Sequence, residues 1–267
     1  MNAPANPKPS VSLVIVPRER FGMAKTSLDS VLAEAPQPYG LICVSGQSPD
    51  QIIAHIDAKA AEHGFRHIKF DRILSPNEVR NIGVRESSGD YVVFLDNDVI
   101  CAPNWLPPLV ACAEETGAEI VTPLTCQGMP PHQVIHQAGG LFARDAAAFF
   151  ATPPGAREVV DIMHHENERI SDLPPLARAE TQLCEFHGVM ARRSVFDRIG
   201  PLDEGMLATK EHLDFCMSVI EAGGKVMIEP SSVVTYVFPN RHNPVTREDM
   251  EFFLVRWSPE WQKRSLR

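Results

Sequence analysis

The chain has 267 residues, of which 44% are hydrophobic and 22% are charged, and its formal net charge is -9. This length and apolar content suffice for one large α/β domain or two small ones. The negative charge argues against a nucleic-acid partner, because a phosphate backbone is repelled where no strong basic patch faces it.

The two ends of the chain differ in composition from the rest. Residues 1–9 hold three prolines and little that could be buried, so we expect a disordered leader. No run of about 18 apolar residues occurs, and the N-terminus lacks the apolar stretch of a signal peptide, which predicts a cytoplasmic protein. Residues 241–267 are predicted to form a helical tail with basic and aromatic residues. A solvated helix is the favoured interpretation, and peripheral contact with the inner face of a membrane or a homodimer contact is the alternative.

Strands and helices alternate along the first half of the chain, as apolar runs and residues at helical spacing indicate. The predicted elements are, in order, a strand at 11–16, a helix at 24–32, a strand at 41–44, a helix at 48–60, a strand at 67–70, a helix at 75–88 and a strand at 91–95. Such an order predicts parallel strands joined by right-handed crossovers, in an open α/β sheet whose ligand lies beyond the carboxyl ends of the strands.

The same signature marks the starts of the second and third helices. Ser48-Pro49-Asp50-Gln51 and Ser75-Pro76-Asn77-Glu78 each place a serine before a proline, with Gln or Glu three residues after the serine. Such a serine can accept a hydrogen bond from the helix backbone, while the Gln or Glu side chain accepts one from the serine N–H. We therefore predict a capping box at both positions.

Beyond about residue 125 the alternation weakens, because prolines break the chain into loops and short pieces, which we expect to shape the acceptor site. Regular patterns return as a strand at 189–191, a helix at 209–221 and strands at 226–228 and 233–237. The six cysteines lack any CxxC pair and lie mostly in apolar stretches, so we predict that they are reduced core residues.

The sharpest chemical signal lies at residues 91–99, where a buried strand leads directly into Asp96 and Asp98. Carboxylates at the carboxyl end of a strand can hold a hard divalent cation together with the phosphate oxygens of a ligand. Asp and Asn are also favoured in turns, so a polar turn without a metal is the alternative interpretation.

The residues around this pair favour the metal interpretation. They are Val79-Arg80-Asn81-Ile82-Gly83-Val84, Ser88-Gly89-Asp90, Pro103-Asn104-Trp105-Leu106, the stretch 188–196 and the stretch 199–204. Together with Asp96-Asn97-Asp98 they resemble the inverting family 2 glycosyltransferases of the GT-A fold. The resemblance implies a Rossmann-like, mostly parallel central sheet flanked by helices. It also implies that residues 10–125 form the nucleotide-sugar-binding half of one domain, and that 126–240 form a more irregular half for the acceptor and the catalytic base.

The resemblance further implies a donor and a metal. The donor is a nucleotide-diphosphate sugar, here expected to be a UDP-sugar, and the metal is Mn²⁺ or Mg²⁺ bound by Asp96 and Asp98. The positions expected to contact the donor are Pro17, Glu19, Ser45, Arg80, Asp96 and Asn97. Many members of the family carry aspartates where this chain has Ser45-Gly46-Gln47-Ser48. The resemblance therefore does not determine which nucleotide the donor carries. For Arg80, a solvated position or an ion pair with Glu86 is an equal alternative.

A second group of candidate residues lies at the start of the helix at 209–221. Inverting transfer needs a general base that removes the proton of the acceptor hydroxyl as its oxygen attacks the sugar. The family usually offers a Glu-Asp pair here, and His212 takes the place of the Asp. Glu211 is the first candidate for the base, because it lies at the start of the helix. His212 is the second, because imidazole titrates near neutral pH, and Asp214 is the third. The alternative is that these charges only stabilise the start of the helix.

Histidine is the remaining candidate ligand type. The resemblance implies a histidine after the last strand as a further metal ligand. Tyr236 occupies the aligned position, and His242 is close enough in sequence to replace it. A solvated histidine in a loop is the alternative for His242, because that is the more common state of a lone histidine. His187 is a candidate sugar contact. The spacing of His132, His136 and His187 is not that of a zinc motif, so we expect no structural metal site from them.

Two other functions are the alternatives. A nucleotidyltransferase also uses a carboxylate-bound metal, but it normally has a Gly-rich loop after its first strand, where residues 17–22 hold one glycine. A non-catalytic binder of sugars or nucleotides fits the histidine at the base position. The acceptor, whether a glycan, a lipid-linked molecule or another hydroxyl compound, is not determined by sequence, because loop shapes set specificity in such folds.

Overall fold

The computed structural model describes residues 9–17, 21–36, 39–144, 159–206 and 211–237. Residues 1–8 of the predicted leader and the whole predicted tail at 241–267 lie outside the described residues. The described strands are β1 (Val11–Val16), β2 (Gly40–Ser45), β3 (Arg66–Lys69), β4 (Tyr91–Asp96), β5 (Val99–Cys101), β6 (Ile120–Gln127), β7 (Val134–Gln137), β8 (Gly140–Arg144), β9 (Val159–Met163), β10 (Ala179–Thr181), β11 (Gly188–Arg192) and β12 (Val226–Tyr236).

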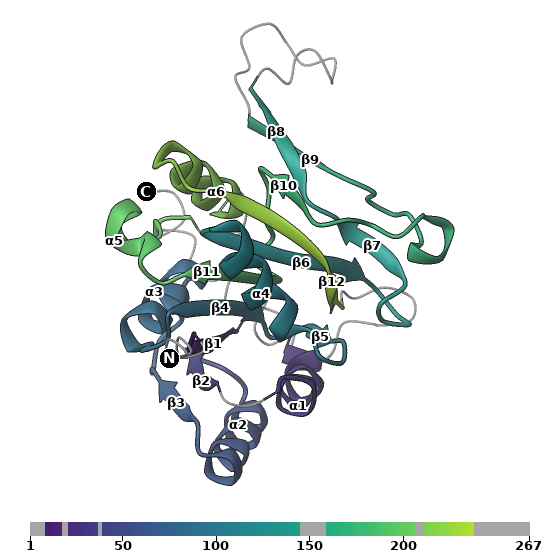
Figure 1. Cartoon of the computed structure of the whole chain (residues 1–267). Coiled ribbons are helices and arrows are strands. Elements are labelled where there is room, and N and C mark those ends of the chain that lie inside the picture. Colours follow the sequence, from purple (N-terminus) through teal and green to yellow (C-terminus); the bar gives the residue numbers. More distant parts are fainter. Residues whose placement is uncertain (1–8, 18–20, 37–38, 145–158, 207–210, 238–267) are drawn as a thin grey trace, which may run out of the picture.

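Ten of these strands form one sheet, which runs through the molecule in Figure 1. Its main order is β10-β12-β6-β11-β4-β1-β2-β3, while β5 pairs with β12 and β7 pairs with β6. The strands β8 and β9 form a separate antiparallel pair. This mixed α/β architecture agrees with the GT-A fold that the sequence predicted.

The first half of the sheet is parallel, as predicted. β1 pairs in parallel with β2 and with β4, and β2 pairs in parallel with β3. Every residue of β1 and β4 is buried, as is typical of parallel strands that helices cover on both faces.

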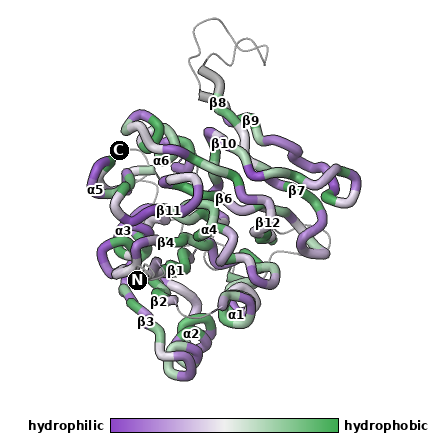
Figure 2. The backbone as a smooth tube through the Cα atoms, viewed as in Figure 1, coloured by the Kyte–Doolittle hydropathy of each residue, from purple (hydrophilic) through white to green (hydrophobic). Residues whose placement is uncertain are grey.

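The helices supply that cover. They are α1 (Ala24–Glu34), α2 (Asp50–His63), α3 (Pro76–Glu86), α4 (Leu106–Thr116), α5 (Val195–Ile199) and α6 (Glu211–Glu221), with short 3₁₀ turns at Phe21–Met23 and Ile170–Asp172. Leu13 of β1 packs in a core with α1, α2 and α4, and its neighbour Val14 packs in a second core with α3, α5 and α6. In Figure 2 the helices carry both hydrophobic and hydrophilic residues, as expected for elements with one buried side.

The second half of the sheet differs from the prediction. The region beyond residue 125, expected to hold loops and short pieces, contains the short strands β7 to β10. The strand β11 lies antiparallel between β4 and β6, within a sheet that was predicted to be mostly parallel. The two strands predicted at 226–228 and 233–237 are one strand, β12, which pairs in parallel with β6 and is irregular between Glu229 and Val233. Pairing with β6 carries the strand through this irregularity, which the local pattern had suggested as a break.

The two predicted capping boxes have different outcomes. At α3, Ser75 is the N-cap, its side chain accepts a hydrogen bond from the Glu78 N–H, and the Glu78 side chain accepts one from the Ser75 N–H. At α2 the prediction is wrong, because Pro49 is the N-cap and no side chain of the described residues caps the helix. Ser48 therefore stands one residue too early to act as the cap.

Two further expectations concern the whole chain. All six cysteines are free and buried, which confirms their prediction as core residues. Among the described residues, no helix combines the length and the apolar character that crossing a membrane requires.

Candidate functional site

The carboxyl ends of β1, β2 and β4 bring three of the predicted donor contacts together. Pro17 follows β1, Ser45 ends β2 and Asn97 follows β4, and all three line a small cavity of about 20 Å³ beside Phe21. The Asn97 N–H donates a hydrogen bond to the carbonyl of Val16, which joins the ends of β1 and β4. Glu19, the fourth predicted contact in this area, lies outside the described residues.

Ser45 is held by a histidine that the sequence analysis did not select. The Ser45 hydroxyl lies 2.8 Å from Nε2 of His67, and Nδ1 of His67 lies 2.8 Å from Asp57. Burial lowers the pKa of His67 below its ordinary value, although Asp57 acts in the opposite direction. A neutral His67 can donate to Asp57 through Nδ1 while its Nε2 accepts from the Ser45 hydroxyl.

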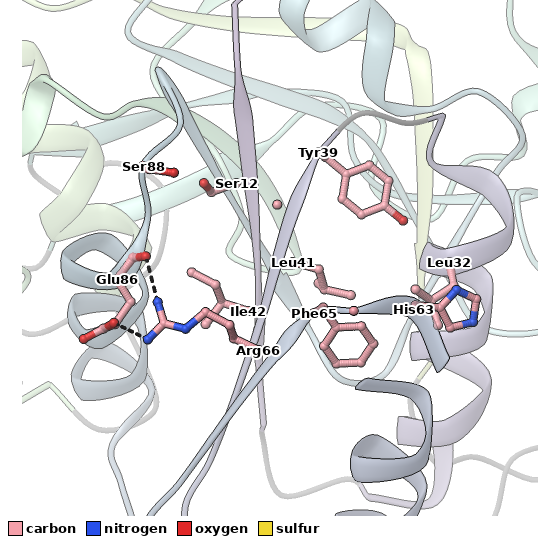
Figure 3. Close-up of a pocket in the computed structure, with 12 residues that line it drawn as sticks. Ser12, Leu32, Tyr39, Leu41, Ile42, His63, Phe65, Arg66, Glu86 and Ser88 are labelled. Atoms are coloured by element: carbon pink, nitrogen blue, oxygen red, sulfur yellow. Dashed lines mark hydrogen bonds and ion pairs between the residues drawn. The ribbon is translucent and has the colours of Figure 1, made fainter. Parts of the chain in front are cut away.

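A cavity of about 300 Å³ lies at the opposite, amino ends of the same strands, as Figure 3 shows. It is lined by Ser12 of β1, Gly40 of β2, Arg66 of β3 and Ser88, which precedes β4. Among the described residues that line it, none is a predicted site residue, and Arg66 is paired with Glu86. Because ligands of open α/β sheets bind at the carboxyl ends of the strands, we do not assign the donor site to this cavity.

Asp96 and Asp98 lie at the centre of the carboxyl edge. Asp96 is the last residue of β4 and pairs with Val16, whereas Asp98 follows in the turn to β5. The two residues are 1% and 2% exposed. Oδ1 of Asp96 accepts from Nη2 of Arg80 at 3.4 Å, and Oδ2 of Asp96 lies 3.1 Å from Nδ1 of His187. Both oxygens of Asp96 are thus held by cationic or polar partners.

Arg80 connects this pair to the predicted catalytic helix. It is fully buried, and its Nη1 donates to Asn77 at 2.9 Å and lies 3.9 Å from Oε1 of Glu211. Its guanidinium also lies 3.6 Å from the ring centroid of Phe186, which is cation–π distance. The two alternatives for Arg80, a solvated position and a pair with Glu86, are therefore wrong. The guanidinium of Arg80, which belongs to α3, contacts the end of β4 and the start of α6.

His187 stands between Asp96 and Tyr236. Its ring stacks on Tyr236 with 3.8 Å between centroids and an interplanar angle of 11°. Burial opposes protonation of His187, but the hydrogen bond and the charge of Asp96 outweigh it and raise the pKa of His187. Tyr236, which the sequence aligned with a metal-binding histidine, thus packs beside this edge, while His242 lies outside the described residues.

The three predicted bases lie in different surroundings. Glu211 is the first residue of α6, is 4% exposed and faces Arg80. Nε2 of His212 lies 3.5 Å from Glu185 and 3.7 Å from Asp161. Burial lowers the pKa of His212, but these two carboxylates raise it more, so the net shift is upward.

Asp214 lies outside this cluster. Its side chain is exposed by surface area, but neighbouring protein atoms still remove part of the water around its carboxylate. This partial desolvation, together with the charge of Asp203, raises the pKa of Asp214. The structure therefore brings Glu211 and His212 toward the edge at which Asp96 and Asp98 lie, and leaves Asp214 apart from it.

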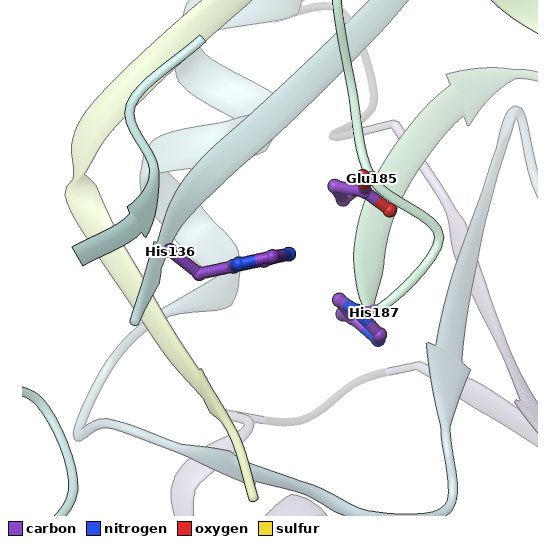
Figure 4. Close-up of side chains that lie close together, drawn as sticks. All are labelled: His136, Glu185 and His187. Atoms are coloured by element: carbon purple, nitrogen blue, oxygen red, sulfur yellow. The ribbon is translucent and has the colours of Figure 1, made fainter. Parts of the chain in front are cut away.

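Three residues of the site were missed by the sequence analysis as ligands. They are His136 of β7, Asp161 of β9 and Glu185, which precedes β11. Figure 4 shows the His136 ring directed toward Glu185 and His187. Burial and the nearby His187 and His212 lower the pKa of His136 to about 3. The one available signal was Glu185, a lone carboxylate within the apolar run Leu183–Phe186.

Carboxylates gather among the described residues of the site. The carboxylates are those of Asp96, Asp98, Asp161, Glu185 and Glu211, and the permanent cation that faces two of them is Arg80. Buried carboxylates are costly unless cations accompany them. The carboxylates of Asp96 and Asp98 lie together with His187 within 4.8 Å, and carboxylate oxygens are the ligands that a hard divalent cation prefers.

Comparison with known proteins identifies a family for most of the chain. The family model described as "Glycosyl transferase family 2" matches residues 12–200. The pre-mycofactocin glycosyltransferase of Mycobacterium tuberculosis is 26% identical over 190 residues, which cover 71% of this chain and 34% of the relative. The chain thus spans about a third of that relative.

Two solved structures share the fold. A crystal structure of GalNAc-T7 with UDP, GalNAc and Mn²⁺ superimposes with a TM-score of 0.66 at 16% identity, and covers 97% of this chain and 50% of the other. The mannosyltransferase PcManGT from Pyrobaculum calidifontis, in complex with GDP-Man and Mn²⁺, gives a TM-score of 0.57 at 14% identity, and covers 89% of this chain and 59% of the other.

Proposed function

The chain belongs to glycosyl transferase family 2, and from this premise we propose that it moves a sugar from a nucleotide-diphosphate donor to a hydroxyl group of an acceptor. The observation that carries the proposal is the buried link between Asp96 and Glu211. Arg80 contacts both residues, at 3.4 and 3.9 Å, and so fixes the predicted metal-binding strand relative to the predicted catalytic helix. A transferase needs these two functions held side by side.

We place the nucleotide of the donor at the carboxyl ends of β1 and β2. Pro17, Ser45 and Asn97 line one cavity there, and Glu19 belongs to the same proposed set. The similar structures were solved with UDP in one case and GDP-Man in the other, and a UDP-sugar is our proposed donor. The contacts of Arg80 with Asp96 and Glu211 support a positioning role for Arg80 beside its proposed diphosphate contact.

We propose that Asp96 and Asp98 hold Mn²⁺ or Mg²⁺, with His242 as the candidate third ligand. Two buried carboxylates supply the oxygen ligands that these hard cations prefer. When bound, such an ion supplies positive charge against the departing nucleotide diphosphate. The hydrogen bond from His187 and the ion pair with Arg80 keep the Asp96 carboxylate in one orientation.

We propose Glu211 as the general base of an inverting reaction. Its carboxylate forms an ion pair with Arg80. An ion pair of this kind favours the ionised carboxylate, which is the form that can accept a proton. His212 is less suited, because Glu185 and Asp161 raise its pKa and so favour the protonated form. His212 then serves as a positive partner between two carboxylates. The acceptor would be a glycan, a lipid-linked molecule or another hydroxyl compound, and membrane contact or dimer formation would involve the tail at 241–267.

The decisive experiment measures nucleoside diphosphate release from UDP- and GDP-sugars with Mn²⁺. We expect turnover in the wild type, a loss of about 100-fold or more in Asp98→Ala, and a loss of about 10² to 10⁴-fold in Glu211→Gln. Asp214→Asn is the matched control and should stay within about twofold. With an acceptor in hand, NMR of the product should show an inverted anomeric centre.

The same assay separates the alternatives. Pyrophosphate release from a nucleoside triphosphate and a sugar phosphate would support a nucleotidyltransferase instead. Tight binding of a sugar nucleotide without any turnover would support a non-catalytic binder. Full activity in Asp98→Ala would overturn the proposed role of the aspartates.

A further inference from the structure

A second group of ligand-type side chains lies beside the aspartates. His136 comes from β7, and Glu185 and His187 come from the segment that leads into β11. One ligand atom from each of the three lies within 4.8 Å of the other two. Figure 4 shows the three side chains close together, and the centroids of the two imidazole rings are 5.4 Å apart.

Each of the two histidines in this group has a ring nitrogen that can bind a metal ion. Nδ1 of His136 is buried and has no hydrogen-bond partner within the part of the chain that the structure describes. Nδ1 of His187 is engaged by Asp96 at 3.1 Å, which leaves Nε2 as its ligand atom. A ligating histidine commonly donates its other N–H to a carboxylate, which fixes the ring and increases its basicity. Asp96 already stands in that position relative to His187.

The donor set distinguishes this group from the aspartate pair. Two imidazoles and one carboxylate are ligands that suit zinc and its neighbours in the first transition row, whereas carboxylate oxygens suit Mg²⁺ and Mn²⁺. The group also leaves room in a four-coordinate shell for water or a ligand oxygen, as three-ligand zinc sites do.

We propose that His136, Glu185 and His187 form a binding site for a divalent transition-metal ion of the zinc class, next to but separate from the Asp96–Asp98 pair. The proposal does not depend on the transferase activity. The two sites have no ligand in common when His187 contacts Asp96 through one nitrogen and the ion through the other.

A neighbouring group competes for Glu185. Asp161, Glu185 and His212 also offer ligand atoms within 4.8 Å of one another. Nε2 of His212 has no hydrogen bond among the described residues, but it lies 3.5 and 3.7 Å from the carboxylates of Glu185 and Asp161. An imidazolium is attracted to both carboxylates there without a metal. This group has one imidazole instead of two, so it is the less suitable zinc site.

The test is calorimetric titration of the tag-free full-length protein with Zn²⁺ in a large excess of Mg²⁺. We expect the wild type to bind Zn²⁺, and we expect His136→Gln and Glu185→Gln each to weaken the binding at least about tenfold. Asp98→Ala should keep the wild-type Zn²⁺ affinity, because it removes only the oxygen site. His63→Gln, on the distant α2, is the matched histidine control and should bind as the wild type does.

X-ray absorption at the zinc edge provides a second measurement on the wild type alone, in case the variants fold poorly. Two imidazole ligands on the bound ion are expected. The proposal is overturned if His136→Gln binds Zn²⁺ as tightly as the wild type, if His212→Gln loses the site while His136→Gln keeps it, or if the spectrum shows fewer than two imidazoles.

Discussion

Arg80 is the residue on which the charge balance of the site depends. Its side chain is fully buried and faces two buried carboxylates, Asp96 and Glu211. Removing one partner of a buried ion pair leaves uncompensated charge, which typically costs about 3 to 5 kcal/mol. We expect Arg80→Met, which keeps much of the side-chain volume, to lower the free energy of unfolding by about that amount in urea denaturation.

The matched control for Arg80 is another arginine in a surface pair. The side chains of Arg66 and Glu86 are 57% and 39% exposed. Exposed ion pairs contribute at most about 1 kcal/mol, so Arg66→Met should lower the free energy of unfolding by no more than this. Equal losses in the two variants would contradict the role of Arg80 as the buried counter-charge.

His67 gives a prediction about pH. Burial lowers its pKa in the folded state, whereas the unfolded imidazole titrates at about 6.5. Below that pH the unfolded state binds more protons, so the folded state loses stability as pH falls toward the folded pKa. Between pH 7.5 and 5.5 we expect the wild type to lose up to about 1 kcal/mol more unfolding free energy than His67→Gln.

Urea denaturation at the two pH values measures this difference. His63→Gln, at the exposed end of α2, should show the pH dependence of the wild type. The prediction fails if wild type and His67→Gln lose the same stability between the two pH values.

At the scale of elements, the starts of α2 and α3 form a natural pair of test and control. Ser75 caps α3 and takes part in a capping box, while Ser48 precedes α2 without capping it. We expect Ser75→Ala to lower the unfolding free energy by about 1 kcal/mol and Ser48→Ala to change it by less than about 0.5 kcal/mol. Chemical denaturation provides both values, and a larger loss in Ser48→Ala would refute the assignment of the caps.

The α3 helix matters beyond its own stability, because it carries Arg80 into the site. Gly83, one turn further along, lies so close to β1 that an added Cβ would stand 2.4 Å from Cγ1 of Val14. This close approach of helix and strand lets the guanidinium reach Asp96 at the end of β4. The position of the site thus depends on how tightly α3 packs on the parallel sheet.

At the scale of the whole molecule, the charges at the site link elements from all along the chain. Asp96 and Asp98 follow β4, Arg80 comes from α3 and Glu211 begins α6. An ion that binds this folded arrangement and not the unfolded chain stabilises the whole domain, by about 2.7 kcal/mol at 100 times its dissociation constant. We therefore expect Mg²⁺ to raise the melting temperature relative to EDTA.

Thermal unfolding of variants identifies the residues responsible for that shift. Asp98→Asn should lose the shift, while Asp197→Asn, an exposed acid on α5, should keep it. His136→Gln should also keep it, since oxygen ligands are the ones that Mg²⁺ prefers. A shift of the same size in Asp98→Asn would place the Mg²⁺ site elsewhere.

The local pattern of residues was enough to predict the parallel half of the sheet, the helices beside it and the edge at which Asp96 and Asp98 lie. Apolar runs and helical spacing are properties of neighbouring residues, so they can be recognised without a fold. The same holds for the Ser75 cap, whose partners are three residues apart. The family resemblance rested on motifs of this local kind, and the match over residues 12–200 confirms the family.

Only the tertiary structure decided the rest, because it depends on residues that meet across long stretches of chain. Strand pairing makes β12 one strand and inserts β11 antiparallel between β4 and β6. Packing of α3 buries Arg80 against Glu211, which no spacing along the chain indicates. His136 and His187 come together for the same reason, since β7 and the segment before β11 converge only in the folded sheet.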